Sequence, residues 1–163
     1  MAGPSSLEVV LVQIAHKSKV LLSSFQVLLV DDCRFQRVLT EILLGRLGIT
    51  PTIASGGDEA ICLDGHRDFD LILMDIQMPG MDGFETTRRI REAQARRERP
   101  RRVPVIAYTA CQMPLDAELM RRSGMNDAIQ KPCSATTMRD CLLHWCPDTV
   151  SSSIRRVKSD AHA

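Results

Sequence analysis

Five short apolar runs alternate with five helical patterns along the chain, and this alternation limits the fold more than any other feature. The runs are continuous in apolar residues, as in strands that are buried on both faces of a sheet. We expect strands at Gln26–Val30, Thr50–Ala54, Asp70–Met74, Val103–Ala107 and Asp127–Gln130. We expect helices at Arg34–Leu47, Gly57–His66, Gly83–Arg97, Pro114–Ser123 and Ala135–Cys146. Alternating strands and helices predict a five-stranded parallel sheet with helices on both faces, which is a doubly wound α/β fold.

The 163 residues suffice for one domain with short terminal segments. The alternating series predicts that this domain occupies residues 25–146. Residues 1–24 hold a short apolar stretch interrupted by lysines, so this arm could be a helix, an extra strand or a loose segment. Residues 147–163 are rich in serine, aspartate and basic residues without apolar periodicity, which predicts a solvated, disordered tail.

The composition argues against several classes of protein. A net charge of +1 and an aromatic content of 4% provide neither the basic surface nor the stacking side chains of a nucleic-acid-binding protein. No apolar stretch approaches the roughly 18 residues that a membrane span requires. Six cysteines without a CxxC pair, together with the lack of a secretory signal, favour reduced thiols. We therefore expect a monomer in the cytoplasm, with the nucleus as a second location, that binds neither nucleic acid nor a membrane.

Polar side chains follow four of the predicted strands, at the edge where ligands bind in open parallel sheets. Asp31 and Asp32 follow the first strand, Asp75 the third, Thr109 the fourth and Lys131 the fifth. Carboxylates at close range repel each other unless a cation lies among them, and an oxygen-only ligand set favours Mg²⁺. An aspartate can attack phosphorus to give an aspartyl-phosphate, while a metal, an ammonium group and a hydroxyl stabilise the phosphoryl oxygens. The pattern therefore predicts phosphoryl chemistry at this edge.

The segments that carry this pattern closely resemble a response-regulator receiver domain over about residues 25–146. They are Val30–Asp32, Leu73–Gly83, Thr109–Ala110 and Lys131–Pro132. The resemblance implies a flavodoxin-like sheet in the order 2-1-3-4-5. Stand-alone receivers, the receivers of hybrid histidine kinases and the short regulators of plant phosphorelays are all similar to this chain, so the source lineage stays open.

The resemblance also implies a role for the acidic residues. Asp75 would accept a phosphoryl group from a phosphohistidine on a histidine-phosphotransfer protein or a histidine kinase. Asp32, Asp75 and the backbone carbonyl of Gln77 would bind Mg²⁺ directly, and Asp31 would help through water. The chain would then act in a phosphorelay of a two-component regulatory system.

Two further residues complete the implied site. Thr109 would bond a phosphoryl oxygen and Lys131 would pair with it, and the bond between Lys131 and Pro132 is cis in the family. Such a domain accepts a phosphoryl group and slowly loses it by its own chemistry, so we expect no enzyme with turnover. Asp82, in the loop after the third strand, is expected to cap the following helix rather than to bind metal.

One residue departs from the family pattern. Ala128 stands where family members usually carry a tyrosine or phenylalanine whose ring rotates on activation, so the usual conformational output is in doubt. Tyr108 lies beside Thr109, but neighbouring strand residues point to opposite faces. No helix-turn-helix, basic heptad region or second core follows residue 146, so we expect no output domain and a role as relay, phosphate sink or protein-interaction regulator.

The first predicted helix carries more apolar residues than one face can bury. At about 100° per residue, its expected core stripe is Phe35, Val38, Leu39 and Ile42, and Leu44 points away from it. The additional apolar residues are either scattered exposed leucines or a docking patch for a helical phosphotransfer partner. The family resemblance favours the docking patch. The residues assigned to that patch are Phe35, Leu39, Leu43 and Pro132.

Eight arginines fall between Arg88 and Arg102, interspersed with glutamates. A solvated, soluble face is the first interpretation of this segment. A surface for an acidic partner is the second, and nucleic acid is a distant third because aromatic residues are few.

Three other functions fit parts of the pattern. A receiver-like docking module that is never phosphorylated is one, although the intact acidic set argues against it. A Mg²⁺-dependent phosphohydrolase with an aspartate nucleophile is another, but Ile76 and Gln77 supply no general acid beside Asp75. A flavin carrier would need a Ser/Thr/Gly-rich phosphate loop after the first strand, where this chain has Asp31 and Asp32.

Overall fold

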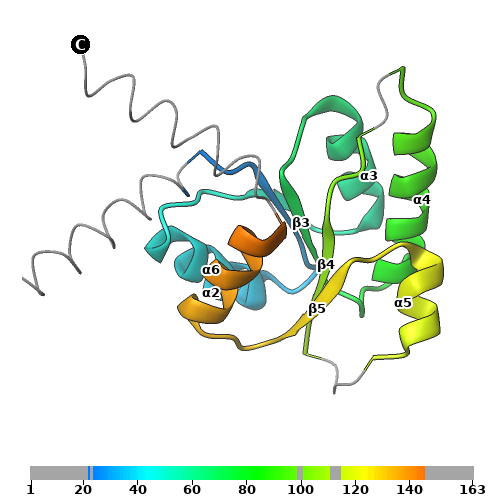
Figure 1. The fold of residues 1–163 in the computed structure, drawn as a ribbon. Helices are drawn as coiled ribbons and strands as arrows, with labels where there is room; N and C mark the ends of the chain where they lie inside the picture. The colour runs from blue at the N-terminus through cyan, green and yellow to red at the C-terminus, as the bar shows by residue number, and fades with distance from the viewer. Residues whose placement is uncertain (1–21, 23, 99–100, 111–114, 146–163) are drawn as a thin grey trace, which may run out of the picture.

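The computed structural model describes residues 22, 24–98, 101–110 and 115–145. A single parallel sheet runs through its middle in the order β2-β1-β3-β4-β5 (Figure 1). The strands are β1 (Val27–Val30), β2 (Thr52–Ala54), β3 (Leu71–Met74), β4 (Val105–Thr109) and β5 (Asp127–Gln130). The helices are α2 (Arg34–Arg46), α3 (Gly57–His66), α4 (Gly83–Ala95), α5 (Ala117–Ser123) and α6 (Ala135–Trp145). The predicted five-stranded doubly wound fold and its strand order are confirmed.

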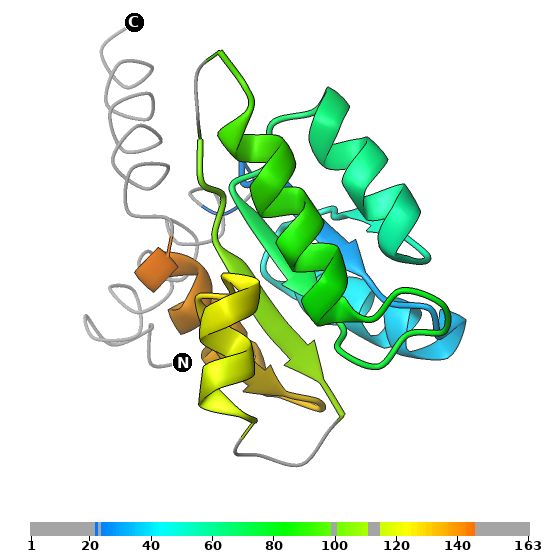
Figure 2. The same cartoon turned by 90° about the vertical axis from the view of Figure 1, so that its right-hand side faces the viewer.

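The sheet separates two apolar cores. Helices α2 and α6 cover one face, and α3, α4 and α5 cover the other (Figures 1 and 2). Leu29, Leu44 and Met138 lie in the first core, while Val30, Ala60 and Ile90 lie in the second. Each residue of β1 and β3 is fully buried, which is why their sequences are continuous in apolar residues rather than alternating.

The observed boundaries differ from the predicted ones where prolines and caps intervene. Strand β4 begins at Val105, because Pro104 has no N–H to donate to a sheet ladder. At its other end the strand includes Thr109. Helix α5 begins at Ala117, where the side chain of Asp116 accepts a hydrogen bond from the N–H of Leu119. It ends at Ser123 and is capped by Gly124, whose φ of 84° is a left-handed conformation that glycine adopts without steric cost.

The predicted core stripe of the first helix is wrong. Phe35 and Leu39 of α2 are 70% and 51% exposed, and Val38 and Ile42 are exposed with them. The buried side of the helix holds Thr40 and Leu44, and Leu43 and Leu47 pack against the same core. Burial of Thr40 is possible because its hydroxyl donates to the carbonyl of Gln36 at 2.9 Å. Apolar residues cover most of this helix, so periodicity alone did not determine which stripe faces the sheet.

Leu22 is 1% exposed and packs in the core beside Phe25, so at least this residue of the predicted N-terminal arm belongs to the domain. The rest of the arm up to residue 21 and the predicted tail at 147–163 lie outside the described residues. Within the described part of the chain, no helix has the length and apolar character needed to cross a membrane.

Candidate functional site

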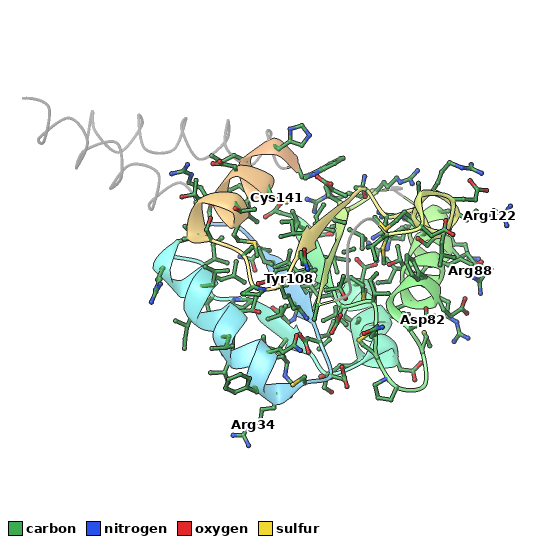
Figure 3. All side chains as sticks on the ribbon, turned by 90° about the horizontal axis from the view of Figure 1, so that it is seen from below. Arg34, Asp82, Arg88, Tyr108, Arg122 and Cys141 are labelled. Carbon is green, nitrogen blue, oxygen red and sulfur yellow. The ribbon has the colours of Figure 1, made fainter. Side chains whose placement is uncertain are left out.

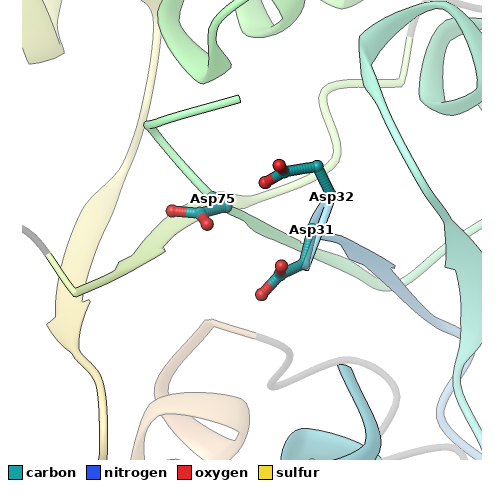
Figure 4. Close-up of side chains that lie close together, drawn as sticks. All are labelled: Asp31, Asp32 and Asp75. Carbon is teal, nitrogen blue, oxygen red and sulfur yellow. The ribbon is translucent and has the colours of Figure 1, made fainter. Parts of the chain in front are cut away.

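Three carboxylates gather where β1 and β3 end (Figure 4). In the register of these neighbouring strands Val30 pairs with Met74, so the residues that follow, Asp31 and Asp75, leave the sheet at the same height. Together with Asp32, each offers a carboxylate oxygen within 4.8 Å of the others. Asp31 and Asp75 are buried, whereas Asp32 is exposed. The predicted convergence of the three aspartates is therefore present.

The ammonium group of Lys131 partly balances these charges. It enters from the end of β5 and lies 2.5 Å from Asp31 Oδ2 and 3.2 Å from Asp75 Oδ2. The peptide bond from Lys131 to Pro132 is cis, as expected, and the Lys131 N–H donates to the carbonyl of Thr109 at 2.8 Å. Three carboxylates and one ammonium leave an excess of negative charge, which suits a divalent cation.

One oxygen in this cluster stands out. Asp75 Oδ1 is buried and has no hydrogen-bond partner among the described residues. By contrast, Asp31 Oδ1 accepts a hydrogen bond from the N–H of Cys33 at 2.8 Å. An unsatisfied buried carboxylate oxygen is costly, so a ligand at this position would remove that cost. Hard cations such as Mg²⁺ bind carboxylate and carbonyl oxygens, so the residues fit such an ion.

The loop after β3 approaches the backbone of Asp75 closely. A Cβ atom on Gly83 would lie 2.1 Å from the carbonyl oxygen of Asp75, and the Gly83 N–H donates to the carbonyl of Ile76 at 2.9 Å. Asp82 accepts a hydrogen bond from the N–H of Glu85 at 2.8 Å, so its predicted capping role is confirmed. The close approach of Gly83 to the Asp75 backbone is visible only in the structure.

Thr109 is the last residue of β4 rather than the first residue after it, and it is 1% exposed. Its neighbour Tyr108 packs in the core on the α2 and α6 face, whereas Ala128 packs against the core on the opposite face. Tyr108 therefore does not fill the position of the ring that Ala128 lacks. Instead, Lys131 Nζ lies 5.2 Å from the centre of the Tyr108 ring, a distance typical of cation–π contacts. Burial raises the pKa of Tyr108, so its hydroxyl stays protonated.

Three of the four predicted docking residues are accessible. Phe35, Leu39 and Pro132 are exposed, but Leu43 is half-buried and packs against the core. Leu39 and Pro132 line a cavity of about 250 Å³ together with Tyr108, Ala110 and Lys131. Gln36 and Thr40, which the sequence did not single out, complete the lining. Gln77 is exposed in the loop after β3, and its role as a ligand stays a prediction.

Comparison with models of protein families shows to which family the chain belongs. The model of the response regulator receiver domain matches residues 27–143. The chain belongs to the response regulator receiver domain family. Receiver domains act in two-component phosphorelay signalling, as the resemblance implied.

Curated relatives of this receiver domain are sensor kinases. It is 37% identical over 120 residues to the sensor protein GacS of Pseudomonas syringae, covering 74% of this chain and 13% of GacS. It is 35% identical over 120 residues to the autoinducer sensor kinase/phosphatase CqsS of Vibrio cholerae, covering 74% of this chain and 17% of CqsS. Histidine kinase 5 of Arabidopsis thaliana is 31% identical over 142 residues, covering 74% of this chain and 15% of that protein. The receiver domain thus matches a small part of each relative.

Two solved receiver domains share its architecture. The receiver domain of the sensor histidine kinase PA1611 of Pseudomonas aeruginosa has a TM-score of 0.66 and 34% identity, covering 76% of this chain and 98% of that one. That structure holds a magnesium ion in its active site cleft. The receiver domain of the Arabidopsis thaliana histidine kinase CKI1 has a TM-score of 0.65 and 28% identity, covering 77% of this chain and 95% of that one. It was crystallised with Mg²⁺ and BeF₃⁻.

Proposed function

We propose that this receiver domain accepts a phosphoryl group on Asp75 from a phosphohistidine of a partner protein, in a step that depends on Mg²⁺. The observation that supports this best is Asp75 Oδ1, which is buried at the carboxyl end of β3 without a hydrogen-bond partner in the described structure. An oxygen in this state is available both to a cation and as a nucleophile. The other Asp75 oxygen, Oδ2, faces the Lys131 ammonium at 3.2 Å.

The transfer step follows from this placement. An Asp75 carboxylate oxygen forms a bond to phosphorus while the bond from phosphorus to the imidazole nitrogen breaks, and the electron pair stays on that nitrogen. Mg²⁺ would supply positive charge to the carboxylates and phosphoryl oxygens, held by Asp32, Asp75 and the Gln77 carbonyl, with Asp31 acting through water. This metal set and the other roles are proposals supported by the acidic cluster.

Lys131 and Thr109 stabilise the phosphorylated state in this proposal. Lys131 is 8% exposed and lies between two carboxylates, so phosphorylation of Asp75 offers its ammonium an additional anionic oxygen. The buried hydroxyl of Thr109, at the end of the neighbouring strand β4, bonds a phosphoryl oxygen. The domain passes the group on or loses it slowly, and does not turn over a small substrate. It therefore serves as a relay, a sink or a protein-interaction regulator in the cytoplasm.

The partner is a histidine-phosphotransfer protein or a histidine kinase, and it docks on the exposed face of α2. Phe35, Val38, Leu39 and Ile42 are all exposed there, next to the cavity that Lys131 and Pro132 line. Apolar side chains that are exposed together on one helix favour contact with another protein. The domain acts as a monomer that uses this face, and needs neither nucleic acid nor a membrane.

Phosphotransfer from a phosphorylated histidine-phosphotransfer protein in the presence of Mg²⁺ tests the proposal. We expect an acid-stable, base-labile label on the wild-type chain and none on Asp75→Asn. Asp82→Asn is the matched control, because asparagine also caps helices and Asp82 lies in the same loop. A folded wild-type protein that binds Mg²⁺ but takes no label from several donors would contradict the proposal and favour a docking module that is never phosphorylated.

A further inference from the structure

Residues of α4, of α5 and of the segment before β4 line a basic groove. Helices α4 and α5 lie on the face of the sheet opposite to α2 (Figures 1 and 2). The volume of the groove is about 450 Å³, within the range of ligand-binding clefts. None of the residues that line it belongs to the acidic cluster. Six arginines line it, together with Glu92: Arg88, Arg91, Arg101, Arg102, Arg121 and Arg122.

Arg91 and Arg102 lie close to each other in this groove, and the negative charge of Asp64 offsets part of the positive charge at Arg91. Arg91 donates only to neutral acceptors, the carbonyls of Gly124 at 3.0 Å and Val103 at 2.6 Å and the side chains of Gln94 and Asn126. A Cβ atom on Gly124 would lie 3.0 Å from Arg91 Cγ and 3.4 Å from an Arg102 nitrogen, so both arginines border this glycine. Burial lowers the pKa of Arg91 to about 10, and the nearby positive charge of Arg102 contributes to this shift. An anion between them would relieve that repulsion.

The remaining arginines of the groove already contact carboxylates, and Arg101 contacts Asp68 at 3.9 Å and Asp70 at 3.1 Å. Arg121 and Arg122 both contact the single carboxylate of Glu118, at 2.8 Å and 2.6 Å. Arg88 contacts Glu85 and Glu92, but Glu85 also binds Arg89. Solvent weakens ion pairs at the surface, so an incoming carboxylate can replace or join them.

The groove continues into an apolar end. A second cavity of about 260 Å³ shares Arg88, Arg122 and Ser123 with the first. It is also lined by the apolar residues Phe84 and Leu119 and by two acidic residues, Asp82 and Glu85, so it suits an apolar side chain rather than a further carboxylate. Leu119 is 44% exposed, although it is a large apolar residue. Figure 3 shows Arg88 on α4 and Arg122 on α5 on the same side of the molecule, away from Arg34 on α2. The groove therefore offers guanidinium groups at one end and an apolar contact at the other.

We propose that this groove binds an acidic segment of a partner protein, with its carboxylates on the arginines and an apolar side chain against Leu119. Charge complementarity selects this occupant. The terminal segments of this chain, 1–21 and 146–163, each hold more lysine and arginine than aspartate and glutamate, so neither complements the groove. Among the described residues no aromatic side chain lines the arginine end, which disfavours a nucleic acid that needs base stacking. This site is separate from Asp75 and does not rest on the proposed phosphoryl transfer.

Fluorescence anisotropy with a labelled synthetic peptide tests this inference. The probe carries one leucine followed by a run of glutamates, and the control peptide has glutamine in place of each glutamate. We expect the acidic peptide alone to bind, with affinity that falls as salt is raised. The double substitution Arg102→Glu and Arg122→Glu should weaken binding by at least about tenfold, because two attractive charges become repulsive. Arg46→Glu, an exposed arginine on α2, should change affinity less than about twofold.

A second pair of probes tests the apolar end. Leu119→Ser should weaken binding of the leucine peptide about threefold and leave a peptide with alanine in place of leucine unchanged, since the lost contact is between two apolar side chains. Circular dichroism verifies that each variant is folded, and Asp75→Asn should bind the peptide as well as wild type does. Equal binding by wild type and the double variant would overturn the inference. So would tighter binding of inorganic pyrophosphate than of the peptide, because the groove would then suit a small phosphorylated ligand.

Discussion

Replacing Gly83 by alanine tests whether the loop after β3 holds Asp75 in place. The added Cβ would lie 2.1 Å from the Asp75 carbonyl oxygen, and such contacts do not occur below 3.0 Å, so the two backbones must separate by about 0.9 Å. The Cβ is fixed by the backbone of residue 83 and the oxygen is a backbone atom of Asp75, so no side-chain rotation can relieve the contact. Overpacking of this kind costs about 1–3 kcal/mol, whereas alanine in an open helix position gains about 0.5–1 kcal/mol over glycine. A shift of nearly 1 Å at a reacting group can slow its reaction about 100-fold.

Gly45→Ala is the matched control, because Gly45 lies in α2 and a Cβ there would meet nothing within 4 Å. In urea unfolding we expect Gly83→Ala to be less stable than wild type and Gly45→Ala to be slightly more stable, with a difference of about 1.5–4 kcal/mol between the two variants. Labelling by phosphoramidate with Mg²⁺, followed by intact-protein mass spectrometry, should be slow in Gly83→Ala alone. If Gly83→Ala were as stable as wild type and were labelled at the same rate, the reasoning that this loop positions Asp75 would be refuted.

Three further predictions address Lys131, the α2 face and two thiols, the half-buried Cys141 and the exposed Cys62. Lys131→Met should lower the free energy of unfolding by about 3 kcal/mol without divalent cation, since two buried carboxylates lose their counter-charge. Mg²⁺ should then stabilise this variant in urea unfolding more than wild type, because no ammonium competes for the carboxylates, and equal stabilisation would argue against a shared site. Leu39→Glu should slow phosphotransfer from a histidine-phosphotransfer protein about tenfold and leave phosphoramidate labelling unchanged. Leu143→Glu, which is exposed on α6, should alter neither rate, and equal effects of the two substitutions would exclude docking on α2. Burial raises the pKa of Cys141 to about 12, so at about pH 8 iodoacetamide should modify it far more slowly than the exposed Cys62, with a rate that rises as pH approaches 12. Peptide mass spectrometry measures both thiols, and comparable rates at that pH would contradict the burial of Cys141.

The strands and the acidic cluster could be predicted because their signals are local. A run such as Leu71–Met74 is apolar throughout since both faces of the sheet are covered, and the residue after it lies at the ligand-binding edge of a parallel sheet. Asp31 and Asp75 therefore converge for a topological reason that the order of elements already contains. The cis bond before Pro132 and the capping role of Asp82 followed from the family resemblance and from helix chemistry.

The orientation of α2 could not be predicted in the same way. Apolar residues surround most of the circumference of this helix, so the stripe that faces the sheet depends on how it packs against α6 and the strands. Thr40 faces the core and Leu39 is exposed. The error has a functional consequence, because the expected core residues are the exposed ones and they extend the proposed docking face.

The groove between α4 and α5 was also beyond reach of the sequence. The arginines between Arg88 and Arg102 were expected to form a solvated face. Only the fold brings Arg121 and Arg122 opposite them and places Gly124 beside two guanidinium groups. The groove forms by tertiary packing of residues about 30 positions apart in sequence, and no local sequence pattern predicts such contacts.

Borohydride reduction of the phosphorylated protein tests the central claim most directly. This reagent converts an aspartyl-phosphate into homoserine, and peptide mass spectrometry then locates the modified residue. We expect homoserine at position 75 only, and only in samples that received both a phosphodonor and Mg²⁺. Modification at Asp31 or Asp32 instead, or no modification in folded protein after phosphotransfer, would contradict the assignment of Asp75 as the phosphoacceptor.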